Sequence, residues 1–425
     1  MSSANRTQII LLQPAPFDSQ AIFRSHAMPK STRRPTAHLY VSVAAVFLAT
    51  TILFATASII RAGDAHDLPE PATQAMSTLI ERIQDRGPIE TQDLLPLLRF
   101  ARDTAFTRDD WDVPSLLNAT GGYYGYGISS PMDRIVEHIY HPDLPPSFFH
   151  PSVVRVGKWS EEPEENIPDL WNNLEEGRIV VIRGQELEEN TPDVNTGGYY
   201  TYQTDRMIVM VNHEGEKYLL SVSKQADQSN VGRKGVVIGD DQDWNYFYTD
   251  EEGLTTGGLG WVNSYMFDSF SVTVLSADPT APDRSRHAMF KWVRAGWSGM
   301  NMVRPNHVRN GCQRFAQSLV RLMESDELPE LGVLVAMSKR VRAMDELEIL
   351  RTLQPYIESL RETAPEDSIL SRRSFQRILN QDNPLEHYSL YAKQSLVMKE
   401  FLKASVGLPA LLAVNQDEAL VSFLR

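Results

Sequence analysis

Residues 199–225 read YYTYQTDRMIVMVNHEGEKYLLSVSKQ, and this stretch decides the expected fold. Two runs rich in β-branched and aromatic residues flank the pentapeptide NHEGE, whose glycine suits a tight turn. The stretch therefore predicts a β-hairpin of two antiparallel strands.

Further strand-like runs lie on both sides of this hairpin. They are SVVRVGKW (152–159), RIVVIRG (178–184), KGVVIG (234–239), DWNYFYTD (243–250) and SFSVTVLSA (269–277). The segment IPDLWNNLEEG (167–177) reads as a helix between the first two runs. Together they predict a mostly antiparallel sheet of about five to seven strands with a helix or two packed on it.

Helical patterns precede and follow the predicted sheet. Residues 71–105 indicate two helices separated by Gly87 and Pro88, and 130–140 indicate a third. From about Arg286 the chain is expected to be helical, with amphipathic runs at 306–327, 345–363, 384–407 and 408–425. Pro355 is expected to break or kink the second of these runs.

A long uncharged run near the N-terminus indicates a membrane segment. Residues Leu39 to Ile60 contain no charged side chain over 22 positions, enough for a helix to cross a bilayer. Basic residues precede the run and acidic residues follow it, so the N-terminus is expected in the cytoplasm and the body outside. The alternative is a signal peptide cleaved near the small residues ATAS (55–58), and Met28 is a second candidate start.

The fold class we expect is α+β, with a single N-terminal transmembrane helix, a short helical segment, a mostly antiparallel β-sheet domain and a C-terminal helical bundle packed on it. The expected divisions are a cytoplasmic tail (1–38), a transmembrane helix or signal anchor (39–60), a helical segment (61–150), an acidic β-rich domain (151–285) and a helical domain (286–425).

Charge is distributed unevenly along the chain. Residues 1–61, 62–302 and 303–425 carry net charges of +5, −19 and 0. An acidic middle segment repels nucleic-acid phosphates, so we expect no nucleic-acid partner. The single cysteine, Cys312, permits no intramolecular disulfide, and its place on an apolar helical stripe predicts burial.

An acidic run at 240–252, DDQDWNYFYTDEE, suggests a cation site. Asp241, Asp243, Asn245 and Glu252 occupy the first, third, fifth and twelfth places of an EF-hand loop. Tyr246 stands where that loop needs glycine, so an EF-hand is not expected. A different Ca²⁺ site using these oxygens stays open beside the simpler interpretation of an acidic turn, and no other cofactor is expected.

Aromatic residues gather in the same acidic segment. Strand alternation places Trp244, Tyr246 and Tyr248 on one face, and Trp261 follows nearby. Exposed rings beside carboxylates stack on sugars or hold a cation, so these four are candidate ligand-binding residues. Burial in the core of the sheet is the competing interpretation.

Glycine–tyrosine strings occur at TGGYYGYG (120–127) and TGGYYTYQ (196–203). We interpret them as turns in which paired glycines adopt positive φ before aromatic residues enter the next element.

These patterns predict a membrane-anchored, single-pass protein of the cell envelope. Its exported body is expected to bind a ligand or a protein partner without catalysis, since the sequence lacks the serine-hydrolase, phosphate-loop and metalloprotease motifs. One alternative is an exported hydrolase that cuts a glycan or cell-wall substrate with carboxylates of the β-rich domain. Another is a scaffold for assembly with a second membrane protein.

Overall fold

The structure, a computed structural model, describes residues 66–104, 111–161, 165–194, 196–256, 260–364 and 370–412. Its helices are α2 (Glu70–Asp85), α3 (Thr91–Asp103), α4 (Met132–Ile139), α5 (Ile167–Asn172), α6 (Pro305–Met323), α7 (Leu331–Ala343), α8 (Glu346–Thr363), α9 (Arg373–Leu379) and α10 (Leu390–Ser405), with short 3-10 helices η1 (Pro146–Phe148) and η2 (Asp241–Asp243). Its strands are β1 (His66–Asp67), β2 (Trp111–Asp112), β3 (Thr120–Ile128), β4 (Val154–Glu161), β5 (Ile179–Asn190), β6 (Gly198–Tyr199), β7 (Thr201–His213), β8 (Glu216–Gln225), β9 (Arg233–Val237), β10 (Tyr246–Glu252), β11 (Leu254–Thr256), β12 (Gly260–Val262), β13 (Ser264–Asp278) and β14 (Ala281–Trp297).

A seven-stranded antiparallel sheet forms the centre, in the order β3-β14-β13-β8-β7-β5-β4. The predicted hairpin is confirmed as β7 and β8, which pair from Thr204 opposite Gln225 to His213 opposite Glu216. Glu214 and Gly215 form the two-residue connection with φ of 56° and 79°. Positive φ at both positions matches the twist of a two-residue hairpin, which explains why this short segment sets the register.

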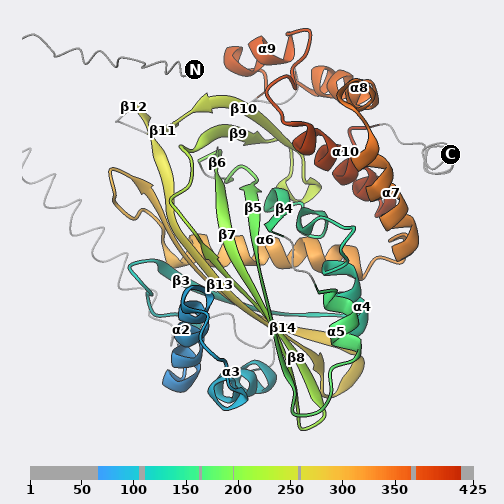
Figure 1. The fold of residues 1–425 in the computed structure, drawn as a ribbon. Coiled ribbons are helices and arrows are strands. Elements are labelled where there is room, and N and C mark those ends of the chain that lie inside the picture. Colours follow the sequence, from blue (N-terminus) through green and yellow to red (C-terminus); the bar gives the residue numbers. More distant parts are fainter. Residues whose placement is uncertain are drawn as a thin grey trace, which may run out of the picture. The chain divides into compact units, whose positions relative to one another are not determined.

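One face of the sheet is apolar and packs against α2 and α3, which lie together beside it in Figure 1. Alternate positions of the strands supply this face because successive side chains point to opposite sides. The contributing residues include Met207, Val209, Val211, Leu220, Val222, Phe270, Val272, Val274, Phe290 and Trp292. Each fully buried apolar side chain stabilises the fold by about 1.5–3 kcal/mol, so this layer holds the sheet in place.

The intervening positions form the opposite face, which we call the cavity face. Its members include Arg206 on β7, Ser223 on β8, Ser271 on β13 and Lys291 on β14, which the strand register places in one row. Helix α6 packs across this face and contacts β3 and β14. Figure 1 shows α6 running across the strands.

The C-terminal helices α7, α8 and α10 share a second core with α4, α5 and strand β10. The amphipathic runs at 306–327, 345–363 and 384–407 are confirmed as α6, α8 and α10. Helix α8 continues through Pro355, which the sequence predicts as a break or kink. Helices α7 and α9 were not predicted, and residues 413–425 of the last predicted run lie outside the described residues.

The string at 120–127 is strand β3 and not the expected turn. Its glycines stand where neighbours approach closely: a Cβ on Gly121 would lie 2.6 Å from Val113 Cγ1, and one on Gly122 would lie 2.9 Å from Val308 Cγ1 of α6. The glycines therefore serve close packing, for which strands also use glycine. In the second string Gly197 has φ of 67°, in agreement with the expected turn.

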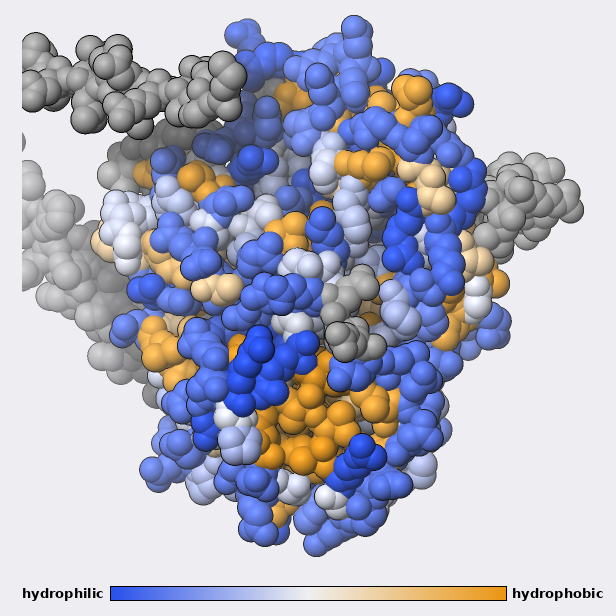
Figure 2. Space-filling view, in the orientation of Figure 1, coloured by the Kyte–Doolittle hydropathy of each residue, from blue (hydrophilic) through white to orange (hydrophobic). Residues whose placement is uncertain are grey.

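Strands extend into both ranges expected to be helical, because β3 lies within 61–150 and β14 continues to Trp297. The candidate membrane segment 39–60 lies outside the described residues. Within the described ranges, no helix combines the length and apolar character that a membrane crossing requires. The face in Figure 2 is mainly hydrophilic, with one apolar area below its centre, between the positions of α3 and α5 in Figure 1.

Candidate ligand-binding cavity

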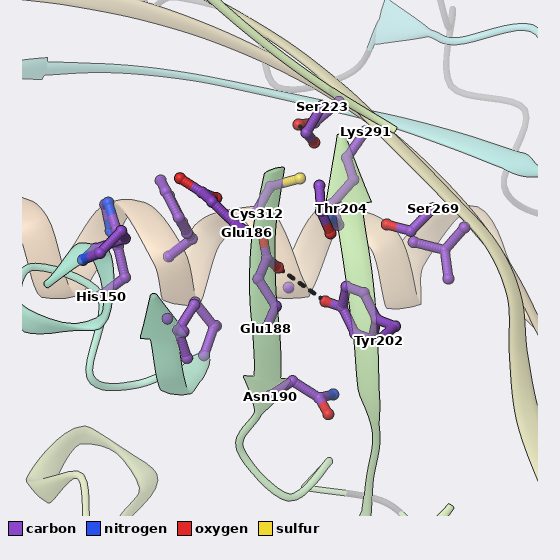
Figure 3. Close-up of a pocket in the computed structure, with 18 of the residues that line it drawn as sticks. His150, Glu186, Glu188, Asn190, Tyr202, Thr204, Ser223, Ser269, Lys291 and Cys312 are labelled. Carbon is purple, nitrogen blue, oxygen red and sulfur yellow. Dashed lines mark hydrogen bonds between the residues drawn. The ribbon is translucent and has the colours of Figure 1, made fainter. Parts of the chain in front are cut away.

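A cavity of about 840 Å³ lies between the cavity face of the sheet and α6. Strands β5, β7, β8, β13 and β14 supply one wall, and Val308, Gly311, Cys312 and Phe315 of α6 supply the other. Figure 3 shows labelled side chains of both walls, with α6 passing along the site. Protein interiors are otherwise packed to the density of organic crystals, so a space of this size is unusual inside a domain.

Small side chains on both walls leave this space open. The sheet contributes short hydroxyl residues at positions where a close-packed core would carry Leu or Ile: Thr204, Ser221, Ser223, Ser269, Ser271 and Thr273. Across from them α6 carries Gly311 and Cys312. The same strand alternation thus places large apolar residues on the face toward α2 and α3 and small residues on the cavity face.

A charged network occupies the β5–β7 end of the cavity. Arg206 Nη2 lies 2.6 Å from Glu186 Oε2 and 3.1 Å from Glu188 Oε1. The hydroxyl of Tyr202 donates a hydrogen bond of 3.0 Å to Glu188 Oε2, drawn as a dashed line in Figure 3. Arg206 Nη1 also donates to Ser221 Oγ over 3.3 Å.

Burial dominates the electrostatics of Glu186, whose residue is 3% exposed. It raises the pKa of this carboxyl, while the Arg206 guanidinium acts in the opposite direction. Burial and the Glu188 charge raise the pKa of Tyr202 well above its usual value. The charges of the network are therefore paired with each other, and the Tyr202 hydroxyl stays protonated.

Two histidines and the cysteine of the cavity are held neutral. Burial lowers the pKa of both His150 and His287 to about 3. It raises the pKa of the Cys312 thiol to about 12, and the charge on Lys291 opposes this rise. A protonated thiol is a poor nucleophile, so Cys312 lacks the activation that cysteine catalysis requires. Its predicted burial is confirmed, with 1% of the residue exposed.

Polar groups without protein partners also face the cavity. Thr204 is 3% exposed, and its hydroxyl makes no hydrogen bond within the described part of the chain. Lys291 makes no ion pair or hydrogen bond with any residue that the structure describes. A buried hydroxyl without a partner costs about 1–3 kcal/mol, so a bound molecule that paired with it would recover free energy.

The aromatic residues predicted as ligand contacts lie elsewhere. Trp244, Tyr246 and Tyr248 are each no more than 4% exposed and belong to the core beneath α8 and α10. The Tyr248 ring lies 3.8 Å from the guanidinium carbon of Arg155, in a cation–π stack. Trp261 is part of β12, and its side chain is outside the described ones. Burial leaves the first three no surface on which to stack a sugar.

The predicted cation ligands are engaged separately. Asp241 Oδ2 forms an ion pair with Arg314 Nε at 2.6 Å, and the amide oxygen of Asn245 accepts a hydrogen bond from Lys403. Asp243 lies in η2 and Glu252 ends β10. Within the ranges described, no group of three or more His, Cys, Asp or Glu residues is arranged to hold a metal ion.

Reasoning from the sequence missed the cavity residues, although one signal for them was present. In SVSKQ (221–225) and SFSVTVLSA (269–277), the hydroxyl residues Ser221, Ser223, Ser269, Ser271 and Thr273 alternate with the apolar residues Val222, Phe270, Val272 and Val274. A strand with a polar face is ordinarily taken to turn that face to solvent. No known family model matches the chain, and no curated protein is similar to it in sequence, so relatives do not identify the cavity residues.

Proposed function

We propose that the protein is a non-catalytic binding protein that holds a small amphipathic molecule between the seven-stranded sheet and α6. The observation that carries this proposal is the cavity of about 840 Å³, which falls in the range of roughly 300–1,000 Å³ typical of ligand sites. Hydroxyls on the sheet side and apolar side chains on the α6 side suit a molecule with one polar and one apolar flank.

The chemistry of the walls favours binding over catalysis. The two histidines have a pKa of about 3, which makes them weak bases, and the thiol is protonated, so neither type of group is prepared as a base or a nucleophile. The hydrolase alternative has one observation in its favour, since Glu186 and Glu188 both face the cavity from β5. Both carboxylates are bound to Arg206, however, and an acid–base pair needs each carboxyl free to exchange a proton with substrate.

The membrane anchor at 39–60 and the exported position of the body are part of the same proposal. They rest on the uncharged run and on the charges that flank it. A ligand-binding body held near a membrane by a single anchor would meet amphipathic molecules that leave the bilayer.

A neutral fluorescent probe tests the binding function directly. Phenylnaphthylamine is dim in water and bright in apolar surroundings, and we expect saturable binding to full-length protein. Gly311 lines the cavity, and a Cβ at this position has open space around it, so we expect Gly311→Phe to occupy part of the cavity. The matched control is Gly332→Phe, in α7, where a Cβ is equally unobstructed.

Gly311→Phe should weaken binding at least about tenfold, while Gly332→Phe should bind as the wild type does. Phenylalanine is also the better helix former, so neither variant should lower the melting temperature. All proteins are titrated in the same buffer, so dye that partitions into a solubilising agent contributes equally to every measurement and does not affect the comparison. Absence of saturable binding, or equal affinity in Gly311→Phe and wild type, would refute the proposed function.

A further inference from the structure

We propose that the molecule held in this cavity carries an acidic group, a carboxylate, sulfonate or phosphate, and that Lys291 binds it. This inference rests on the proposed function, because it assigns the polarity of a ligand in the same site. It identifies an anionic amphiphile as the class of ligand, with its charge at the β14 side of the cavity.

Lys291 projects from the middle of β14 on the cavity face. Its strand neighbours are Ser271 of β13 on one side and Gly122 of β3 on the other. Because Gly122 has no side chain, the β3 residue directly opposite Lys291 does not cover it. Lys291 lines the cavity together with Cys312 of α6, and Figure 3 shows both side chains at this site.

Every other cation of the cavity wall already has an acidic partner. Arg206 binds Glu186 and Glu188, and Arg314 binds Asp241. Lys291 has no such partner among the residues that the structure describes. Lys291 is only partly exposed, and an ammonium that is partly withdrawn from water gains from an oxyanion at hydrogen-bonding distance.

Hydroxyl groups continue from Lys291 along the same row. Ser271 lies beside it, and the Ser271 and Ser223 hydroxyls are hydrogen-bonded to each other over 2.5 Å. Arg206 follows as the next residue of the row, opposite Ser223. At roughly 4.8 Å per strand, about 14 Å separates the backbone of Arg206 from that of Lys291. The acidic residues are therefore held at the far end of the row from the lysine.

The opposite arrangement, a cationic ligand at Glu186 and Glu188, is disfavoured by the contacts of these residues. Arg206 neutralises one carboxylate, and Tyr202 donates to the other. Burial favours a proton on Glu186 as well. The network is closed on itself, whereas Lys291 and the unpartnered hydroxyl of Thr204 are left for a ligand.

A pair of dyes that differ by one charge tests this assignment. Anilinonaphthalene sulfonate is phenylnaphthylamine with a sulfonate added, so the two probes share their aromatic body. Each is titrated into full-length wild type, Lys291→Gln, Lys291→Arg and Lys224→Gln. The last is the matched control, because Lys224 lies on β8, two strands from β14 in the same sheet, but on the opposite face.

Lys291→Gln should weaken the sulfonate dye about tenfold to a hundredfold and leave the neutral dye within about twofold. Lys291→Arg should retain most of the sulfonate affinity, and Lys224→Gln should retain all of it. Added salt should weaken the sulfonate dye in wild type and have little effect in Lys291→Gln.

The outcomes separate this inference from the proposed function. If Gly311→Phe blocks the neutral dye but Lys291→Gln binds the sulfonate dye as wild type does, the cavity remains the binding site and the acidic ligand is refuted. Equal losses for both dyes in Lys291→Gln would also refute it, because the lysine would then act through shape. Failure of both dyes to bind wild type would overturn both conclusions.

Discussion

Buried histidines in the cavity wall predict how the stability of the protein depends on pH. His287 is 1% exposed, stacks on Tyr126 with ring centroids 4.7 Å apart and lies 3.1 Å from Ser285 Oγ through Nε2. Burial lowers its pKa to about 3, against an ordinary value of about 6.5 in the unfolded chain. Between these values the unfolded chain binds a proton that the folded chain does not, so stability falls as the pH falls below about 6.5.

The magnitude follows from the two pKa values. Between pH 7.5 and pH 5 the proton bound by the unfolded state lowers the free energy of unfolding by about 2 kcal/mol. This result is nearly the same for any folded-state pKa below about 4, because the folded histidine is then neutral throughout the interval. Replacing His287 by Gln or by Phe removes the titrating group, although the two replacements differ in packing.

Urea unfolding measured at a series of pH values provides the test. The difference in unfolding free energy between wild type and His287→Gln isolates this residue, since all other groups titrate in both proteins. From pH 7.5 to pH 5 the wild type should lose about 2 kcal/mol more unfolding free energy than His287→Gln loses. The comparison with His287→Phe should give the same difference. A difference that stays constant across this interval for both variants would show that the histidine is not held neutral.

Two substitutions test the packing and the charge network. Gly122→Ala should lower the free energy of unfolding by about 1–3 kcal/mol, because the new Cβ would lie 3.0 Å from Val308 Cβ and 3.2 Å from the Arg309 backbone nitrogen. The control is Gly332→Ala in α7, where a Cβ has open space, and it should raise the free energy of unfolding by up to about 1 kcal/mol. Equal effects of the two substitutions in urea unfolding would contradict the close approach of α6 to β3. Arg206→Met should lower the free energy of unfolding by about 3–5 kcal/mol, because it leaves a buried carboxylate unpaired. Adding Glu186→Gln to this variant should recover part of the lost stability. A double variant no more stable than Arg206→Met in urea unfolding would argue against the ion pair.

The sequence predicts those parts of the fold that local patterns determine. The hairpin of β7 and β8 follows from two alternating runs around Glu214 and Gly215, which adopt the positive φ that the turn needs. The amphipathic stripe of α6 likewise predicts the helix and the burial of Cys312. Each of these features depends on residues that are close together in the chain.

The candidate aromatic site illustrates what local patterns cannot determine. Alternation in β10 correctly separates Tyr246 and Tyr248 from Phe247, but both sides of the strand are buried. Phe375 packs on Phe247 from α9, and the Tyr388 hydroxyl accepts a hydrogen bond of 3.2 Å from the Tyr248 backbone nitrogen. These partners lie more than a hundred residues further along the chain, so the pattern of the strand alone does not reveal them.

The cavity was missed for a related reason. A helix with an apolar stripe covers some surface, but the stripe does not say which one. Helix α6 lies over the face of the sheet that carries Ser221, Ser271 and Thr273, and this pairing makes a polar face into an interior wall. Neither the helix nor the strands contain that information separately.

Contacts on both sides of the turn that carries Gly311 and Cys312 explain why the space beneath α6 does not collapse. In the first turn of the helix, Val308 lies where a Cβ on Gly122 would stand, as the missing side chain permits. In the middle of the helix, Ser152 Oγ donates to the Arg314 carbonyl over 2.9 Å and lies 3.1 Å from Ser318 Oγ. A 19-residue helix is a stiff rod about 28 Å long, so contacts at Val308 and Arg314 fix the height of the turn between them above the sheet. The small residues between these contacts then set the volume, and the same residues are the ones that a bound molecule would touch.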